Sequence, residues 1–185
     1  TDGALEPRSL YAAQLALRRQ KLGLPADGDA MPLVDLTLDN GEAGTSSTGT
    51  WSISGGGNPY GKTSLFTWEA GATYSYRFEL PRPGRYEVFA WWTEWPSRPE
   101  DVPVEIQRVG GSTWTSVDQR VDGGRWVPLG SWDFDDLATV TIHSGGQGST
   151  CADAFRIRSC WSSLPSSTEG EERILIPSPK VATYD

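Results

Sequence analysis

Most of the chain is built from short runs of alternating apolar and polar residues. The runs are separated by turns rich in Gly, Pro, Asn and Asp, and they have the two-residue period of half-buried strands. Nine runs fit this description: 33–38, 50–54, 73–79, 85–93, 102–108, 113–121, 125–133, 138–143 and 153–158. Because no helical pattern interrupts them, they predict an all-β fold, an antiparallel β-sandwich or jelly roll.

The two ends of the chain depart from this pattern. The predicted organisation is a helical segment at 1–24, a linker at 25–32, the sandwich at 33–160 and a flexible tail at 161–185. The helix has Ser9 as a plausible N-cap and Gly23 at its end, whereas the tail is rich in Ser, Pro and Glu. The first ten residues lack the basic and apolar regions of a signal peptide.

Composition excludes several classes of function. The net charge is −8, with no run of Lys or Arg, which argues against nucleic acid and anionic membranes as partners. A single His, His143, leaves little room for transition-metal sites or Ser/His/Asp catalysis. Cys151 and Cys160 flank one run and cannot form a disulfide if that run is extended. No catalytic residues are predicted, and the chain is not expected to be an enzyme.

The run at 85–93 carries unusually large side chains. Alternation places Tyr86, Val88, Ala90 and Trp92 on one face and Glu87, Phe89, Trp91 and Thr93 on the other. The first face has no charge and is predicted to be core. The second mixes a carboxylate with two aromatic rings, which is typical of a partly solvated face. Trp91 is therefore either an exposed ring or a ring covered by a loop or by the N-terminal helix.

The loop that follows, TEWPSRPED (93–101), combines groups that suit a sugar ligand. The indole of Trp95 offers a flat apolar surface to the C–H face of a pyranose, and Glu94 and Arg98 can bond to its hydroxyls. Two prolines stiffen the loop, which lowers the cost of ordering it. Tyr60, in the turn NPYG, is another candidate ring. The alternatives are a surface ion pair between Glu94 and Arg98, and a Tyr60 that simply packs on its neighbour.

A calcium ion is the one cofactor that the sequence suggests. Asp35 and Asp39 lie in DLTLDNGEAG, and Asp153 begins the last run, which a jelly roll can bring beside the first. The alternative is that Asp39, Asn40 and Gly41 form a metal-free turn.

Five segments in chain order resemble the golvesin/xanthan-lyase C-terminal domain family over roughly residues 33–158. They are LDNGEAGTSSTGTWS, NPYGKTSLFTWEAGATYSYRFELPRPGRYEVFAWWTEWPSR, VPVEI, VDGGRWVPLGSWDF and STCADAFRI. The resemblance implies a galactose-binding-like β-sandwich that is carbohydrate-binding-like, non-catalytic and attached to a secreted bacterial enzyme. Separately, PRSLYAAQLALRR (7–19) is similar to the tail of some secreted β-helical polysaccharide lyases.

Together these observations predict a secreted, extracellular polysaccharide-binding module. Its expected partners are a polysaccharide or cell-surface glycan and a tethered catalytic domain. By binding the polymer, the module raises the effective concentration of the catalytic domain there. The acidic composition favours neutral chains. The alternative is a structural or adhesion module whose aromatic patch packs against a protein partner or its own catalytic domain.

Overall fold

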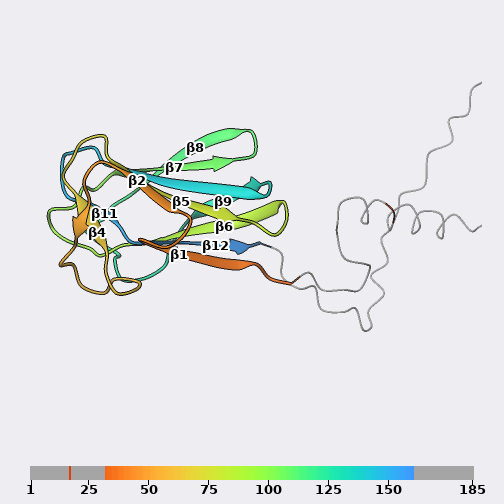
Figure 1. The fold of residues 1–185 in the computed structure, drawn as a ribbon, viewed down its shortest axis with the longest axis horizontal. Helices are drawn as coiled ribbons and strands as arrows, with labels where there is room; N and C mark the ends of the chain where they lie inside the picture. The colour runs from red at the N-terminus through yellow and green to blue at the C-terminus, as the bar shows by residue number, and fades with distance from the viewer. Residues whose placement is uncertain (1–16, 18–31, 161–185) are drawn as a thin grey trace, which may run out of the picture. The chain divides into compact units, whose positions relative to one another are not determined.

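The computed structural model describes Leu17 and residues 32–160, and all its strands lie in one compact unit, Pro32–Ser162 (Figure 1). The strands are β1 (Asp35–Asp39), β2 (Thr45–Thr48), β3 (Ser52–Ile53), β4 (Leu65–Thr67), β5 (Thr73–Glu79), β6 (Gly84–Trp91), β7 (Val102–Arg108), β8 (Gly111–Val117), β9 (Val127–Phe134), β10 (Leu137–His143), β11 (Thr150–Ala152) and β12 (Ala154–Ser159).

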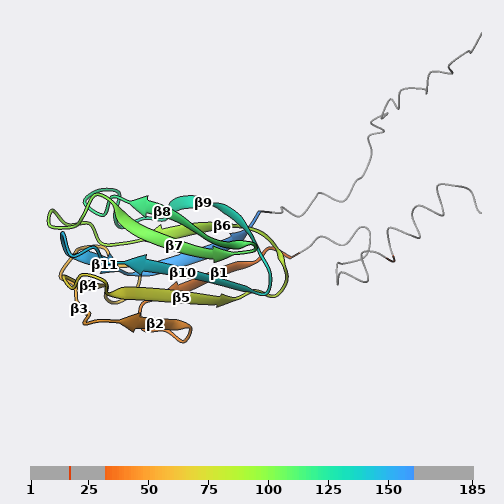
Figure 2. The same cartoon turned by 90° about the horizontal axis from the view of Figure 1, so that it is seen from above.

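These strands form two main antiparallel sheets and one small one. The four-stranded sheet has the order β1-β12-β6-β9, and the five-stranded sheet has the order β2-β5-β10-β7-β8. Figure 2 shows the second order directly, from β8 across to β2. The short strands β11, β4 and β3 make the third sheet. The antiparallel β-sandwich predicted from the sequence is confirmed.

The core lies between the two main sheets and follows the predicted alternation. On β6, the side chains of Tyr86, Val88 and Ala90 are buried, whereas Glu87 and Phe89 on the other face are half exposed. The five-stranded sheet contributes a second set of buried side chains, among them Tyr74, Tyr76, Phe78, Val104, Ile106, Val140 and Ile142. Burial of apolar surface on this scale is the main source of the fold's stability.

One irregularity shapes the four-stranded sheet. The pairing of β6 with β9 shifts register between Val88 and Phe89, opposite Gly130. Gly130 has a φ of 147°, and a Cβ there would lie 2.8 Å from the ring of Trp132. The glycine therefore permits a β-bulge under an indole that packs against the core.

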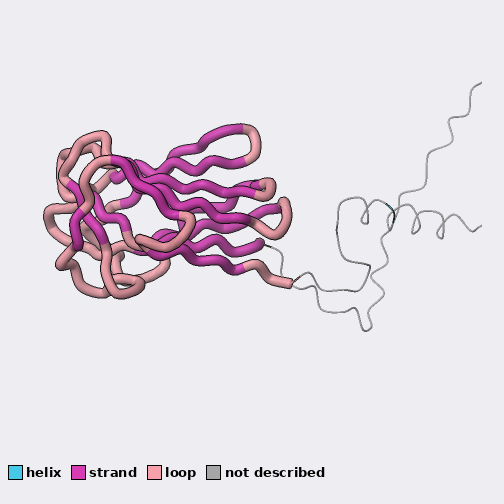
Figure 3. The backbone as a smooth tube through the Cα atoms, in the orientation of Figure 1, coloured by secondary structure: helices cyan, strands magenta, loops and turns pink. Residues whose placement is uncertain are grey.

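Loops gather at one end of the sandwich, and the described chain enters and leaves at the other end (Figures 1 and 3). Ser159 and Val34 lie together at that second end, joined by a 2.8 Å backbone hydrogen bond. The loop end is therefore directed away from the two points at which the described chain continues.

Some features differ from the sequence predictions or lie outside the described residues. Strands β2, β4 and β11 were not predicted. Of the predicted N-terminal helix only Leu17 is described, and it is helical. The rest of that helix, the linker through Met31 and the tail from 161 lie outside the described residues. Cys151 is buried, Cys160 is exposed, and both are free thiols. Within the described part of the chain, no helix is long and apolar enough to cross a membrane.

Candidate functional site: two hollows lined by Trp95

Backbone hydrogen bonds join the loops at the loop end to one another. Ser149 N donates to Ser97 O at 2.9 Å, Gln119 N to Pro99 O at 3.1 Å, and Gly124 N to Trp92 O at 2.9 Å. The loop 92–101 is therefore bonded to two others along its length. Because satisfied loop backbone opens less readily, this end is a rigid surface for displaying side chains.

Trp95 begins a tight turn in this loop. Arg98 N donates to Trp95 O at 3.0 Å, and Pro96 occupies the second position of the turn, where its fixed φ is favourable. The indole that precedes the proline is 52% exposed. The exposed ring predicted at position 95 is therefore present. It lies on a turn whose backbone is already hydrogen-bonded.

Arg98 differs from its prediction. The side chain was expected at the surface, either facing a sugar or paired with Glu94, but it is only 4% exposed. Its guanidinium donates to Thr93 O and Ser149 O, both at 3.0 Å, to Ser54 Oγ at 2.9 Å and to Thr93 Oγ1 at 3.0 Å. Arg98 is thus a buried side chain whose hydrogen bonds join the loops that contain Ser54, Thr93 and Ser149. Burial lowers its pKa from the usual value for arginine.

Glu94 remains at the surface but does not pair with Arg98. Its Oε2 accepts a 3.1 Å hydrogen bond from Gly123 N and so joins the loop 92–101 to the loop that follows β8. The alternative interpretation of a surface ion pair between Glu94 and Arg98 is therefore wrong.

The first hollow lies at Trp95 and has a volume of about 270 Å³. It is lined by Ser54, Gly55, Gly56, Phe66, Trp68, Trp95, Ser97, Arg98 and Ser149. Two of these are indoles with large exposed fractions, 57% for Trp68 and 52% for Trp95. The hollow thus combines exposed flat apolar rings with an arginine and several hydroxyls.

Hydroxyl groups in the first hollow are held in place by the fold. Ser97 Oγ and Ser149 Oγ lie 2.8 Å apart, and Ser54 Oγ accepts from Gly56 N at 3.1 Å. Gly56 is required where it lies, because a Cβ there would come within 2.6 Å of the Thr93 side chain. The glycine lets its loop approach Thr93, in the loop 92–101, and form part of the wall of the hollow.

Trp68 lies outside the core, with 57% of its area exposed. Strand β4 ends at Thr67, whose side chain is 2% exposed, so the next side chain is directed outward. A three-residue strand gives too short an alternation to reveal this from the sequence.

The second hollow, also at Trp95, has a volume of about 350 Å³. Its lining residues are Gly57, Asn58, Glu94, Trp95, Pro96 and Arg120. Trp95 is therefore a lining residue of both hollows.

Trp91 and Tyr60, two of the predicted binding residues, lie in a separate ring cluster with Trp126. The ring centroids are 5.7 Å apart for Tyr60–Trp91, 5.0 Å for Tyr60–Trp126 and 5.4 Å for Trp91–Trp126. Trp91 is half-buried and donates from Nε1 to Asn58 O at 3.0 Å. Neither Trp91 nor Tyr60 lines either hollow at Trp95, so the rings predicted as one platform are in two places.

The three carboxylates predicted to bind calcium do not form one set. Asp35 is paired with Arg156, whose hydrogen bonds lower the pKa of that carboxyl group. Asp39 bonds to Asn40 N at 2.8 Å, and its pKa is raised by burial. Among residues 32–160 no group of three or more His, Cys, Asp or Glu side chains is placed to hold a metal ion.

Asp153 is fully buried and contacts the turn that carries Tyr60. Its two carboxylate oxygens accept from Tyr60 N at 3.2 and 3.3 Å. Burial raises the pKa of this carboxyl group to about 7, and the charge of Asp39 adds to the effect. Asp153 thus holds the turn through these hydrogen bonds. Its carboxyl group changes protonation state near neutral pH.

The chain matches the family model of the Golvesin C-terminal domain over residues 36–159. It is 36% identical over 132 residues to a xanthan lyase from Bacillus sp. (strain GL1), covering 68% of this chain and 14% of that protein. The chain therefore spans about one seventh of the length of this relative.

Solved structures agree with this match. The Paenibacillus xanthan lyase superposes with a TM-score of 0.65 at 26% identity, over 74% of this chain and 14% of that one. CBM35 from Cellvibrio japonicus Abf62 superposes with a TM-score of 0.51 at 15% identity, over 67% of this chain and 92% of that one, which shows a shared fold. The chain belongs to the Golvesin C-terminal domain family.

Proposed function

We propose that the described sandwich is a non-catalytic module that binds a polysaccharide at its loop end. One observation carries this proposal: two exposed indoles, Trp68 and Trp95, border a hollow that also contains fixed hydroxyls. A sugar ring has an apolar C–H face that stacks on an indole and hydroxyls that bond to polar groups beside it. The cluster of apolar surface also exceeds what scattered surface residues present.

The direction of the loop end supports the same function. The described chain enters and leaves at the opposite end of the sandwich, so the two points at which it continues lie away from the hollows (Figure 1). We propose that the module belongs to a longer, secreted enzyme that acts on an extracellular polymer. By holding the polymer close, it raises the effective concentration of substrate for a tethered catalytic domain.

Family membership suggests the first polymer to test. The relative at 36% identity is a xanthan lyase, so xanthan is one probe, and a neutral β-glucan is the other because the chain carries a net charge of −8. Affinity electrophoresis of residues 32–160 through gels containing each polymer measures retardation directly. We expect retardation in at least one gel, and its loss in Trp95→Ala and in Trp68→Ala.

The matched control is Trp91→Phe, which keeps an aromatic ring in the separate cluster and is expected to bind normally. Binding that survives both Trp95→Ala and Trp68→Ala contradicts the site. If neither these gels nor a broad glycan array detects binding, the loop end serves instead as a protein-packing surface, and the structural or adhesion role replaces the proposed one.

A further inference from the structure

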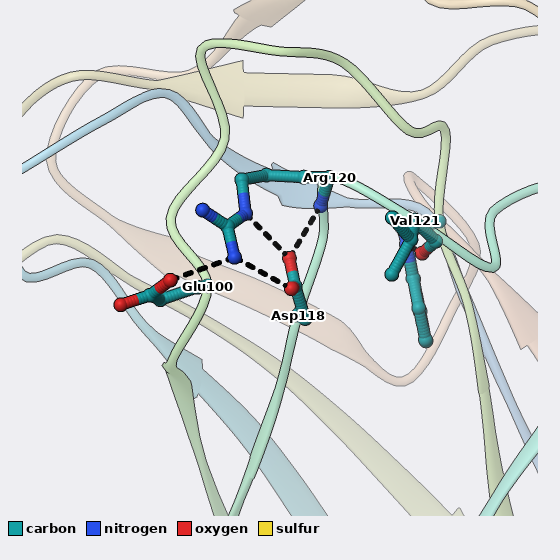
Figure 4. A network of polar contacts seen from close by, with 5 residues as sticks. Glu100, Asp118, Arg120 and Val121 are labelled. Atoms are coloured by element: carbon teal, nitrogen blue, oxygen red, sulfur yellow. Dashed lines mark hydrogen bonds and ion pairs between the residues drawn. The ribbon is translucent and has the colours of Figure 1, made fainter.

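The side chain of Arg120 is held in one position by two carboxylates. Nε and Nη2 donate to Asp118 at 3.0 and 2.8 Å, and Nη2 also lies 2.7 Å from Glu100 Oε2 (Figure 4). The backbone N of Arg120 bonds to the same Asp118 carboxylate at 2.9 Å. These bonds favour one orientation of the guanidinium, while the Arg120 side chain stays 42% exposed.

One nitrogen of this fixed guanidinium is unused. Figure 4 draws bonds to Nε and Nη2 but none to Nη1, and within residues 32–160 Nη1 has no hydrogen-bond partner. Arg120 lines the second hollow together with Trp95 and Asn58. A partly ordered donor and an exposed indole thus line the same hollow, which lowers the cost of ordering the arginine when a sugar hydroxyl binds there.

The charges around the second hollow determine which sugars fit it. Glu94 lines the hollow, and Glu100 and Asp118 lie against Arg120, so three carboxylates accompany one guanidinium. An anionic sugar brought here meets repulsion from these carboxylates, and Arg120 is already neutralised by two of them. A hydroxyl accepts a hydrogen bond from Nη1 without bringing a charge.

We infer that the second hollow is a neutral-sugar subsite in which Arg120 is a specificity-determining donor, and that one polysaccharide chain crosses Trp95 to occupy both hollows. This inference depends on the proposed function, because it assigns a sugar class to the same site. Because Trp95 lines both hollows, one chain that contacts its indole can extend from one hollow into the other. The module therefore recognises the interior of a chain in preference to its end.

The test uses a printed array of neutral and uronate-containing oligosaccharides of increasing length, probed with the wild type, Arg120→Ala, Arg120→Lys and Arg85→Ala. Arg85 is the matched control, since it is an exposed arginine at the opposite end of β6, bonded to Asp133 at 3.2 Å and to Ser131 O at 3.1 Å. Affinities for the bound oligosaccharides are then measured by calorimetry at low and high salt. Circular dichroism confirms that each variant is folded.

We expect the wild type to bind neutral oligosaccharides, with affinity that rises with length until both hollows are filled. Arg120→Ala lowers the affinity for long neutral ligands by about 3- to 10-fold, the value of one hydrogen bond, and leaves the shortest ligands unaffected. Arg120→Lys resembles Arg120→Ala, because a lysine ammonium cannot keep the bidentate bonds to Asp118. Arg85→Ala binds as the wild type does. High salt has little effect, since the contact is to an uncharged hydroxyl.

Several results overturn the inference. Unchanged affinity in both Arg120 variants contradicts the role of Arg120, and preferential binding of uronate-containing glycans that weakens with salt contradicts the neutral class. Affinity that does not depend on length contradicts occupation of both hollows. In each of these cases binding still occurs and is still lost in Trp95→Ala, so the proposed function stands. A wild type that binds no glycan overturns both.

Discussion

Trp95 and Trp91 lie four residues apart in the sequence, but their rings have different neighbours. Trp95 is more than half exposed and lines two hollows, whereas the ring of Trp91 lies within 6 Å of the rings of Tyr60 and Trp126. The composition of the two regions is similar. Their difference shows that a ring packed among other rings leaves less of its surface to a ligand than a ring that lines an open hollow.

The polar groups of the two regions differ in the same way. Around Trp95, Ser54, Ser97 and Arg120 face hollows, and the loops beneath them are bonded together. In the ring cluster of Trp91, Arg156 lies 5.9 Å over the ring of Trp126 and is paired with Asp35. The first region is therefore arranged to contact a guest, and the second stabilises the outer face of the four-stranded sheet.

The largest expected effect is on stability, in the ring cluster. Trp91→Ala removes two edge-to-face ring contacts, the hydrogen bond to Asn58 O and much buried area, so we expect the free energy of unfolding to fall by about 3 kcal/mol. Urea denaturation followed by tryptophan fluorescence measures this loss. A Trp95→Ala variant, measured alongside, is expected to lose under about 1 kcal/mol. Equal losses in the two variants would remove the distinction between the regions.

Arg98 gives a second test of the difference between the two regions, because its hydrogen bonds join loops of the loop end. Arg98→Ala leaves Thr93 O and Ser149 O without their guanidinium partner, which we expect to cost about 2 kcal/mol of unfolding free energy. Hydrogen exchange should localise the effect to the loops around residues 93–98 and 149. Exchange that instead increases around Trp91 and Trp126 contradicts the assignment of Arg98 to the loop end.

A further expected effect is a pH dependence from Asp153. Its folded pKa of about 7 exceeds the unfolded value, so the folded state binds the extra proton between about pH 4 and pH 7. Stability from this group is therefore fully present below about pH 4 and is lost as pH rises from there to about 7, by at most about 1.4 kcal/mol for each pH unit. Thermal melts of the wild type and Asp153→Asn across this range measure it, and the variant should show a flatter profile.

Calcium binding beside Asp153 stays a prediction, and the same melts test it. If Asp39 and Asp153 together hold a calcium ion, added calcium raises the melting midpoint of the wild type at neutral pH by stabilising both charged carboxylates. Asp153→Asn then shows no such rise. A midpoint that calcium leaves unchanged in the wild type contradicts the prediction.

The sequence was informative where alternation continued over many residues. Runs such as 73–79 and 102–108 coincide with β5 and β7, and the two faces of β6 were predicted correctly up to Trp92. The missed strands β2, β4 and β11 have only three or four residues each, too few to show a period. Short strands are defined by their pairing partners, which local sequence does not reveal.

The site was harder to predict than the fold, for a related reason. Arg98 is buried by partners 44 and 51 residues away, Ser54 and Ser149, and nothing in TEWPSRPED indicates them. Trp95 could be predicted because a rigid, proline-flanked loop displays its own side chains. Trp68 and Arg120 could not, because each reaches the hollows only when separate loops meet.

The most direct test of the difference between the two regions compares Trp95→Ala with Trp91→Phe in calorimetric titration against the polysaccharide that retards the wild type most. The loop-end account predicts a loss of about 2 kcal/mol, roughly 30-fold in affinity, for Trp95→Ala and wild-type affinity for Trp91→Phe. Full affinity in Trp95→Ala together with weakened binding in Trp91→Phe would place the ligand on the ring cluster and contradict the account.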